Sequence, residues 1–570
     1  MISTPRWPAW AAILALAAIV SGCSESPTTP SVSPEGAADT TAEPVTAEVA
    51  VTGGVIQGRV EPGDPDQPTL RQYHGIPYAA APVGALRWAP TAPVTPWEGV
   101  LDASEPGPIC IQRTRVGVPF YDRPLDAELP EQSEDCLTLN VWTEADRRDE
   151  RRPVMVWIHG GGLQGGWGSE QSGRLLAGHG AVVVTFNYRL GRLGFLAHPE
   201  LTAENPGGVS GNQGFRDQVQ ALEWVRDNIE SFGGDPGNVT IFGESAGAYS
   251  VSAMQASPLA RGLFHRAIGQ SGGGFQPMSD RTADRTYAPS AEKLGLQFAA
   301  AVLGEQEDRS LAALRDVPAA AILATAESSP LFNTYEFLPT VDGELLPADI
   351  GAIFAAGRQA DVPTLVGSTD DEGNALLAHF VRFMGPGKSG FATFAGAMLP
   401  ETRDEIEAHY PTGTDAAAMR SWAHLFTDLT FTYPMRAWAR SMGPLESEAW
   451  LYWFTWHPPI AEADAYGAFH GATQSYLFDG LARFRAVPTD ADREFARTLA
   501  ETWVRFAATG DPNGGDLPEW PAFTPENEAY LELGPTIRTG DHLRIPEIAL
   551  IELAWAERRR ANAGASQPDE

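Results

Sequence analysis

Three continuous apolar runs, two of them separated by a helical pattern, constrain the fold of this chain more than any other feature. Residues 154–158, 181–186 and 239–242 consist almost entirely of apolar side chains. Such unbroken runs are typical of strands covered on both faces of a parallel sheet. From Phe215 to Phe232, apolar residues recur at steps of three and four, which predicts an amphipathic helix. Alternating strands and helices predict an α/β fold with a doubly wound sheet.

Later segments continue this alternation. Residues 363–367 are expected to form another strand, and residues 494–506 and 548–560 are expected to form helices. The segment from Thr282 to Phe332 is rich in alanine and has a helical pattern, so it is predicted as an insertion over the active-site face.

The pentapeptide Gly243-Glu244-Ser245-Ala246-Gly247 directly follows the third apolar run. A serine on a sharp turn between a buried strand and a helix has the arrangement of a nucleophile elbow, in which the hydroxyl points outward. The two glycines let such a strained turn pack closely. Because a Gly-x-Ser-x-Gly string also arises by chance, the inference rests on the strand before it and the helix-forming residues after it. The sequence predicts Ser245 as a catalytic nucleophile.

The first apolar run ends in a glycine-rich segment, His159 to Gly162. Attack on an acyl carbon places negative charge on the carbonyl oxygen, and preorganised backbone N–H donors stabilise that charge. We predict that the N–H groups of Gly161, Gly162 and Ala246 form such an oxyanion hole. The alternative is an ordinary glycine-rich turn.

The charge balance argues against a nucleic-acid partner. The chain has 40 Lys and Arg residues against 73 Asp and Glu residues, a formal net charge of -33. Such a surface repels phosphate backbones and anionic lipid headgroups. Hydrophobic residues make up 43% of the chain, which is enough for a large core. No cofactor or metal is expected, and the sequence leaves the oligomeric state open.

The N-terminus is typical of an export signal. After Arg6, residues 10–20 form an apolar run of about 11 residues, too short to span a bilayer as a helix but suitable as a signal-peptide core. The run ends in Val20-Ser21-Gly22-Cys23, which resembles a bacterial lipobox with Cys23 as the acylated residue. The competing interpretation is ordinary cleavage near Gly22. The first predicts an anchored lipoprotein of the bacterial cell envelope, and the second a periplasmic or extracellular protein.

Composition divides the chain into four parts. We expect a signal peptide at 1–22, a disordered tether at 23–50, a folded domain at 51–560 and a flexible tail at 561–570. The tether is rich in Ser, Thr, Pro and Ala and has too few large apolar residues to bury a core. The lipid anchor is the only membrane contact that the sequence predicts.

The cysteine count fits an exported chain. Of three cysteines, Cys23 is assigned to the anchor, which leaves Cys110 and Cys136 as an even pair. An oxidising compartment would let them form a disulfide, and closing that loop is worth about 3.5 kcal/mol of stability. The alternative is two unrelated thiols.

Four further motifs resemble those of the type-B carboxylesterases, the family of the bacterial p-nitrobenzyl esterases and the cholinesterases. The motifs are Gly211–Pro236 leading into the serine turn, Ser133–Asn140, Asn187–Leu196, and Gly510–Asn513 followed by Trp520-Pro521. The resemblance covers roughly residues 50 to 555. It implies an α/β-hydrolase fold: a mostly parallel central sheet flanked by helices, with large helical insertions.

The resemblance also locates a catalytic acid and base, since the triad runs in the order serine, acid, histidine. The loop Gly367–Gly373 matches the family's acid loop and places the carboxylate at Glu372, whereas composition alone leaves Asp370 and Asp371 open as solvated loop charges. Among 11 histidines, His470 matches the family's His-Gly loop.

Three other histidines are expected to be noncatalytic. His159 is expected to be a structural ring beside the oxyanion loop, and His198 and His265 ordinary packing or surface residues. The family usually has a Glu three residues after the catalytic histidine, where this chain has Thr473, although Glu244 is kept. The change implies a different water organisation and a different basicity of His470.

Together these residues imply a serine hydrolase that cleaves small-molecule carboxylic esters through an acyl-enzyme. Its activity is expected to fall as the pH drops through about 6–7, where histidine titrates. Cholinesterase-like members hold a quaternary ammonium with a Trp between the paired cysteines. This chain has Phe120 and Tyr121 there but no Trp, so short-chain or aromatic esters are expected instead. These two side chains either line the gorge or pack the loop.

Three other functions are compatible with this fold. A true lipase would need an apolar interfacial lid, which is not identified in the sequence. An amidase or carbamate hydrolase would use the same triad. A non-catalytic binding protein on the same fold should lack the nucleophile, and the presence of Ser245, Glu372 and His470 argues against it.

Overall fold

The computed structural model describes residues 43–63, 68–113, 129–285, 288–305, 308–325, 337–481 and 486–565. They all belong to one compact unit, Glu43–Glu570. The predicted signal peptide, Cys23, Phe120 and Tyr121 lie outside the described residues.

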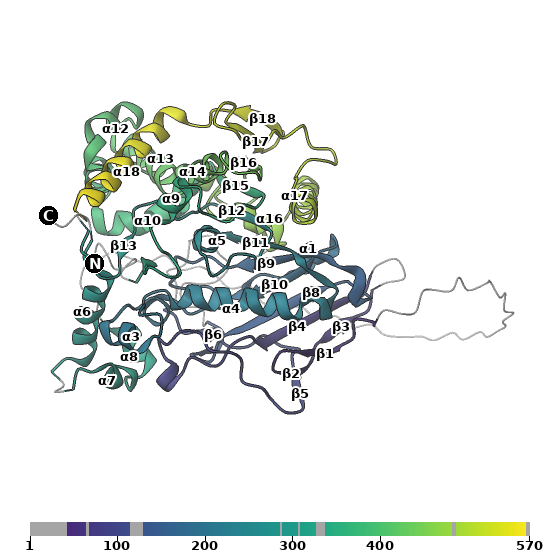
Figure 1. Ribbon diagram of the computed structural model, residues 1–570. Coiled ribbons are helices and arrows are strands. Elements are labelled where there is room, and N and C mark those ends of the chain that lie inside the picture. The colour runs from purple at the N-terminus through teal and green to yellow at the C-terminus, as the bar shows by residue number, and fades with distance from the viewer. Residues whose placement is uncertain are drawn as a thin grey trace, which may run out of the picture. The chain divides into compact units, whose positions relative to one another are not determined.

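A mixed sheet organises the described part of the chain (Figure 1). It has 11 strands in the order β18-β17-β16-β15-β12-β11-β9-β10-β8-β4-β3. The strands from β10 to β17 pair in parallel, and antiparallel pairs close both edges. The strands are β3 (Arg59–Glu61), β4 (Leu70–Pro77), β8 (Thr138–Thr143), β9 (Arg152–Ile158), β10 (Val182–Phe186), β11 (Gly234–Glu244), β12 (Arg266–Gln270), β15 (Thr364–Thr369), β16 (Ala449–Phe454), β17 (Ala529–Leu533) and β18 (Arg538–Asp541).

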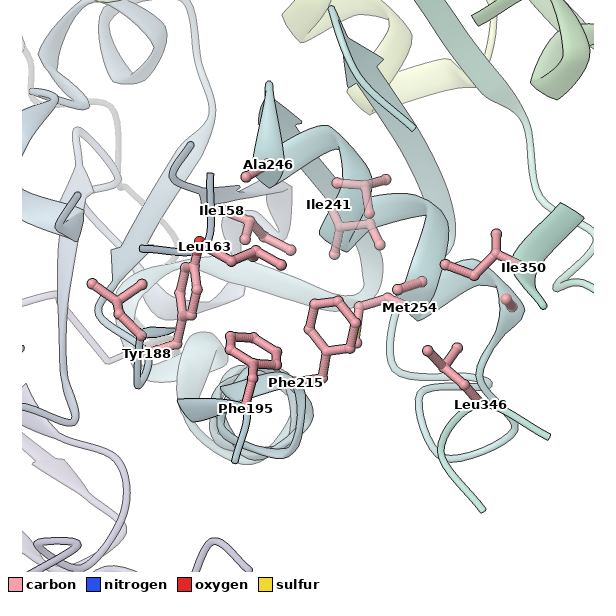
Figure 2. Packing of buried hydrophobic residues seen from close by; sticks show 14 of the residues in the cluster. Ile158, Leu163, Tyr188, Phe195, Phe215, Ile241, Ala246, Met254, Leu346 and Ile350 are labelled. Carbon is pink, nitrogen blue, oxygen red and sulfur yellow. The ribbon is translucent and has the colours of Figure 1, made fainter. Parts of the chain in front are cut away.

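The central strands are apolar on both faces because each face carries its own core. In β9, Val154, Val156 and Ile158 belong to one hydrophobic cluster, and Met155 and Trp157 belong to another. The first cluster packs the sheet against α4 (Gln213–Asn228) and α5 (Ala246–Ala256), as Figure 2 shows around Ile158. The second packs it against α1 (Arg174–Gly178), α16 (Ala472–Leu477) and α17 (Asp490–Thr509). The predicted doubly wound arrangement is confirmed.

Helices follow most of the parallel strands. Three occupy the predicted alanine-rich insertion: α6 (Ala291–Leu303), α7 (Leu311–Arg315) and α8 (Ala319–Ala324). A larger helical set separates β15 from β16. It consists of α10 (Glu372–Met384), α11 (Gly387–Met398), α12 (Arg403–His409), α13 (Asp415–Thr427), a π-helical turn (Asp428–Thr432) and α14 (Tyr433–Met442).

The remaining elements are short or peripheral, apart from a long C-terminal helix. The helices are α2 (Gly191–Gly194), α3 (Pro199–Glu204), α9 (Ile350–Ala355), α15 (Ala463–Tyr466) and α18 (Ile545–Ala565), and the strands are β1 (Glu48–Val51), β2 (Gly54–Gln57), β5 (Val100–Asp102), β6 (Ile109–Cys110), β7 (Gln132–Ser133), β13 (Ser279–Asp280) and β14 (Thr340–Val341). No helix in the described part of the chain is long and apolar enough to cross a membrane.

Both ends of the folded unit differ from the predicted boundaries. Residues 43–50, assigned to the tether, are packed: Val45 and Val49 are buried, and β1 pairs with β2. The tether was predicted from its average composition, in which the contribution of these two valines is not apparent. At the other end, α18 continues to Ala565, into the predicted tail.

Candidate active site

Ser245 lies on the turn that joins β11 to α5. Its backbone has φ 59° and ψ −123°, a strained conformation for a residue with a side chain. The flanking glycines permit the turn. A Cβ on Gly247 would lie 2.0 Å from the carbonyl oxygen of Ile158, and one on Gly243 would lie 2.5 Å from the carbonyl carbon of Gly247. The chain therefore holds a partly exposed serine at the carboxyl edge of the sheet, as the motif predicted.

Glu372 is a fully buried carboxylate at the start of α10. Its Oε1 accepts a hydrogen bond from the Thr369 N–H at 2.8 Å, and its Oε2 lies 2.5 Å from Nδ1 of His470. One oxygen thus anchors the carboxylate to the end of β15, and the other binds the imidazole. An ionised carboxylate at Nδ1 fixes the tautomer whose Nε2 is free to take up a proton.

The two neighbouring aspartates do not contact the imidazole, and neither is a solvated loop charge. Asp371 accepts hydrogen bonds from the Ala468 N–H and from Asn374, both at 3.0 Å, and so ties the acid loop to the histidine loop. Asp370 is partly buried. Burial and the charge of Asp371 raise the pKa of Asp370 to about 6. The expectation that these residues are solvated is wrong, because both loops fold back on the sheet edge.

His470 lies between two carboxylates, with 11% of its side chain exposed. Its Nδ1 faces Glu372, and its Nε2 lies 3.1 Å from Oε1 of Glu244, the residue before the serine. Within the described residues, no hydrogen bond joins the imidazole to the hydroxyl of Ser245. Burial lowers the pKa of His470, but the charges of Glu244 and Glu372 outweigh it and raise that pKa to about 9. The titration expected near pH 6–7 therefore moves upward.

The segments proposed for the oxyanion hole leave the sheet side by side. Ile158 at the end of β9 pairs with Gly243 of β11, so the two turns that follow are neighbours. Gly161 and Gly162 both have positive φ, 114° and 66°. Ala246 begins α5, where backbone N–H groups have no partner within the helix. The two turns therefore lie next to each other at Ser245.

The three histidines that the sequence analysis set aside have structural contacts. The ring of His159 stacks on Tyr188 with 4.3 Å between centroids, and the Tyr188 hydroxyl donates to the His159 carbonyl oxygen. His198 is buried and caps α3, with Nδ1 accepting from the Glu200 N–H at 3.2 Å. Nδ1 of His265 accepts from the Val239 N–H at 3.1 Å.

Thr473 occupies a fully buried position in α16 beneath the histidine. It lies against the hydroxyl of Tyr452, whose pKa is raised well above its usual value by burial and by the charge of Glu372. Thr473 and Gln270 lie close enough to that hydroxyl to oppose the rise, but the side-chain polar atoms of all three residues are buried without a hydrogen-bond partner.

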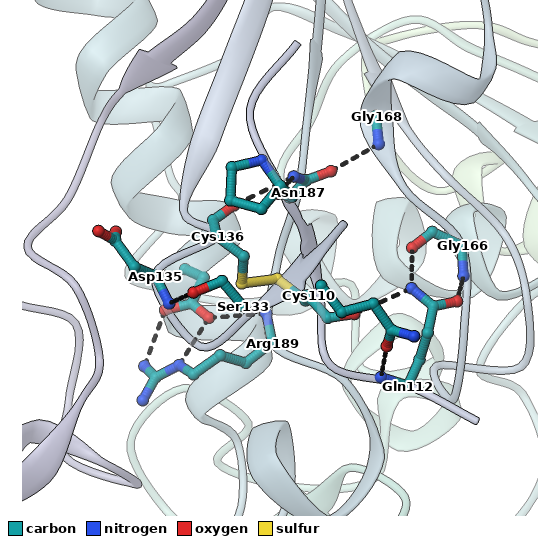
Figure 3. Close-up of a disulfide and its surroundings, with 12 residues drawn as sticks. Cys110, Gln112, Ser133, Asp135, Cys136, Gly166, Gly168, Asn187 and Arg189 are labelled. Carbon is teal, nitrogen blue, oxygen red and sulfur yellow. Dashed lines mark hydrogen bonds and ion pairs between the residues drawn. A yellow bond between two sulfur atoms is a disulfide. The ribbon is translucent and has the colours of Figure 1, made fainter. Parts of the chain in front are cut away.

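A disulfide joins Cys110 to Cys136, and hydrogen bonds link its surroundings to Gly166 and Gly168 (Figure 3). Two residues after Cys110, the side chain of Gln112 bonds both backbone groups of Gly166, at 2.8 and 3.1 Å. Asn187 donates to the Cys136 carbonyl oxygen and accepts from the Gly168 N–H. Through Gln112 and Asn187, the region of the disulfide is therefore hydrogen-bonded to the segment that follows Gly162.

Phe431 is a site residue that the sequence did not reveal. Its ring lies 4.6 Å from the ring of His470, centroid to centroid. Phe431 belongs to the π-helical turn between α13 and α14, and an i→i+5 turn breaks the 3.6-residue periodicity by which a helix face is recognised. Its position close before a Tyr-Pro pair that begins α14 is the one irregularity visible in the sequence.

Comparison with known proteins places the chain among ester hydrolases. The model of the carboxylesterase family matches residues 45–551. The para-nitrobenzyl esterase of Bacillus subtilis (strain 168) is 36% identical over 494 residues, which cover 85% of this chain and 94% of that protein. The fumonisin B1 esterase of Sphingopyxis macrogoltabida is 34% identical, with 84% and 85% covered. Carboxylesterase 1D of Rattus norvegicus is 34% identical, with 87% and 90% covered.

The solved structures agree with these relatives. A thermophilic PNB esterase superposes with a TM-score of 0.74 at 33% identity, covering 88% of this chain and 99% of that one. A second PNB esterase structure has the same TM-score and identity and covers 92% of this chain and 99% of its own.

Proposed function

Because the chain belongs to the carboxylesterase family of ester hydrolases, we propose that it cleaves esters with Ser245 as nucleophile, His470 as base and Glu372 as acid. The observation that carries this proposal is the 2.5 Å contact between Nδ1 of His470 and the buried Glu372, beside a serine on a strained turn. Activating a hydroxyl needs a neighbouring base that a third group orients.

The proposed reaction has two steps. His470 turns its Nε2 from Glu244 to Ser245 and takes the hydroxyl proton as Oγ bonds to the acyl carbon. The imidazolium then gives that proton to the alkoxide as the ester C–O bond breaks, leaving an acyl-enzyme. Water, deprotonated by the same imidazole, releases the acid and restores the serine. Glu372 stabilises the imidazolium in both steps.

We assign the oxyanion hole to the N–H groups of Gly161, Gly162 and Ala246. The assignment is supported by the pairing of β9 with β11, which starts the two donor segments from adjacent positions. It is also supported by the start of α5 at Ala246, since a helix N-terminus carries partial positive charge. Donors held by a rigid sheet stabilise the developing oxyanion without reorganising during the reaction.

We propose short-chain or aromatic esters as substrates. The aromatic ring of Phe431 packs beside His470, and the segment between the paired cysteines has no Trp with which to hold a quaternary ammonium. The similar para-nitrobenzyl esterase is named for an aromatic ester, which agrees with this preference.

We further propose that the protein is exported and anchored through an acylated Cys23. The lipobox-like sequence before Cys23 and the disulfide between Cys110 and Cys136 support export. Metabolic labelling with a tagged fatty acid should mark the wild type. Cys23→Ser should lose the label and move from the membrane to the soluble fraction. An unlabelled wild type would contradict the anchor.

The catalytic assignment is tested by turnover of p-nitrophenyl esters of increasing chain length. Ser245→Ala and His470→Ala should each lower kcat by several orders of magnitude, up to about 10⁶-fold. Ser441→Ala is a matched control, because its hydroxyl donates to a helical carbonyl, that of Ala437, at 2.7 Å. A fluorophosphonate should label the peptide that contains Ser245. Undiminished turnover by Ser245→Ala would refute the assignment.

The same enzyme assays separate an esterase from an amidase. Matched p-nitrophenyl esters and p-nitroanilides with one acyl group should differ strongly in kcat/KM in favour of the ester. A reversed preference would move the proposal to amide hydrolysis with the same residues.

A further inference from the structure

The π-helical turn between α13 and α14 is held at both of its ends. Asp428, its first residue, is fully buried and accepts hydrogen bonds from Arg544 at 2.6 Å on each oxygen and from the Tyr410 hydroxyl at 2.7 Å. Thr432, its last residue, lies with Oγ1 at 3.4 Å from Oγ of Ser368. Wide turns of this kind occur frequently at functional sites. The contacts fix where the side chains between Asp428 and Thr432 point.

Phe431 is the residue of this turn that meets the catalytic histidine. It is 5% exposed, and its ring plane is inclined at 38° to the imidazole, with 4.6 Å between centroids. Glu372 and Glu244 already hold the two nitrogens on the edge of His470. The two carboxylates restrain the imidazole through its edge, and Phe431 covers a face.

This arrangement matters because the imidazole has to move. In the structure Nε2 is directed at Glu244, and the proposed reaction requires it to reach the hydroxyl of Ser245. A ring packed on one face resists tilting out of plane while leaving rotation within the plane open. The same aromatic face attracts the imidazolium that forms during each step, because its quadrupole is negative there.

We propose that Phe431 is a positioning residue for His470, keeping the imidazole oriented between Glu372 and the Glu244-Ser245 segment and stabilising its protonated form. The proposal rests on the proposed role of His470 as base. The π-helical turn determines the position of this ring, because a regular α-helix through the same residues would place position 431 at a different angle to the sheet.

The test compares three variants through pH profiles of kcat and KM with p-nitrophenyl butyrate. Phe431→Leu should lower kcat about tenfold or more with little change in KM, as a misplaced catalytic group does. It should also shift the histidine titration to lower pH, because the imidazolium loses an aromatic neighbour. Phe431→Tyr keeps the ring face and should stay close to wild type.

Phe426→Leu is the matched control. Its ring lies 5.8 Å from that of Phe431, so the substitution removes a similar aromatic side chain from the same helical hairpin. It should lower the Tm without moving the titration. If Phe431→Leu does not fold, Phe431→Met serves in its place, since it nearly conserves volume.

The outcomes separate the two proposals. If His470→Ala remains active, the assigned base is wrong and the role of Phe431 fails with it. If His470→Ala is inactive but Phe431→Leu titrates like wild type, or loses only stability as Phe426→Leu does, the positioning role alone is overturned. The downfield ¹H NMR signal of the proton between His470 and Glu372 should shift in Phe431→Leu and stay in place in Phe426→Leu.

Discussion

At the scale of single residues, the second carboxylate beside His470 raises the pH at which the imidazole becomes a base. Glu244 and Glu372 raise the pKa of the imidazole to about 9, against the pull of burial. Since only the neutral imidazole can accept the serine proton, we expect kcat/KM to keep rising between pH 7 and 9. Glu244→Gln removes one charge, so its profile should level off at a lower pH. Initial rates with p-nitrophenyl butyrate across this range measure both curves.

The exposed Glu526 provides the control, because Glu526→Gln removes the same charge at the surface and should leave the profile unchanged. The stability of the protein follows the same titration. The folded pKa lies above the unfolded value of about 6.5, so this contribution is fully present below that pH and is lost as the pH rises through 9. A Glu244→Gln profile identical to wild type would show that the second carboxylate does not act on the base.

Asp370 gives a second prediction at this scale. Its pKa is raised to about 6, mainly by burial and by Asp371, while its unfolded value is about 3.9. The ionised form is therefore disfavoured in the folded protein, and stability is lost as the pH rises through 6. Asp370→Asn should raise the free energy of unfolding by about 2 kcal/mol at pH 7.5 and by little at pH 4. Urea unfolding at both pH values measures this.

The exposed Asp541 is the comparison residue for that experiment. Asp541→Asn should change the unfolding free energy by no more than about 0.5 kcal/mol at either pH. A lower stability of Asp370→Asn at pH 7.5 would mean that the ionised carboxylate is held by a favourable contact, contrary to its raised pKa.

How far the site could be predicted depended on whether a residue lies in a local motif. The turn at Ser245 has its signature within five consecutive residues, so the sequence predicted it, although the steric demand on Gly247 comes from Ile158 of the neighbouring strand β9. Glu372 was chosen over Asp370 by resemblance alone, since all three carboxylates share one loop. The contact of Glu244 with Nε2 of His470 joins residues far apart in the sequence, and no local rule foresees which partner the imidazole takes.

At the scale of elements, the strands that were predicted are those buried on both faces. Residues 154–158 and 239–242 fall within β9 and β11, and β10 covers the run 181–186 except for its first residue. The strands β17 and β18 were not predicted because they lack such runs. The edge strand β18 has the sequence Arg-Thr-Gly-Asp, and its neighbour β17 alternates buried and half-buried residues. Their pairing comes from the sheet itself, which offers free backbone groups at its edge.

The disulfide gives the prediction that belongs to this scale. Replacing Cys110 and Cys136 together by Ser should lower the free energy of unfolding by about 3 kcal/mol, because the unfolded chain regains the freedom of the closed loop. Since Gln112 and Asn187 link this region to Gly166 and Gly168, kcat should fall as well. Urea unfolding and ester turnover are measured on the same samples.

A reduced wild type is the control for the double Ser variant, since it loses the same covalent link without a change of side chain. The two should lose similar stability. If the variant unfolds at the same urea concentration as the oxidised wild type, the loop is held by its noncovalent contacts and the disulfide is dispensable.

At the scale of the whole molecule, repulsion among the charges that make up a net charge of -33 destabilises the folded state. Added salt weakens both this repulsion and the surface ion pairs, but exposed pairs contribute only about 0–1 kcal/mol each, and 33 carboxylates have no basic partner to lose. The repulsion should therefore dominate, and the Tm at pH 7.5 should rise by several degrees from 10 mM to 0.5 M NaCl, a range that shortens the screening length from about 30 Å to less than 10 Å. Calorimetry in NaCl and in tetramethylammonium chloride separates screening from binding of a particular cation, because screening raises the Tm equally in both. A Tm that falls with either salt would mean that exposed ion pairs such as Arg497–Glu494, rather than repulsion, govern the response.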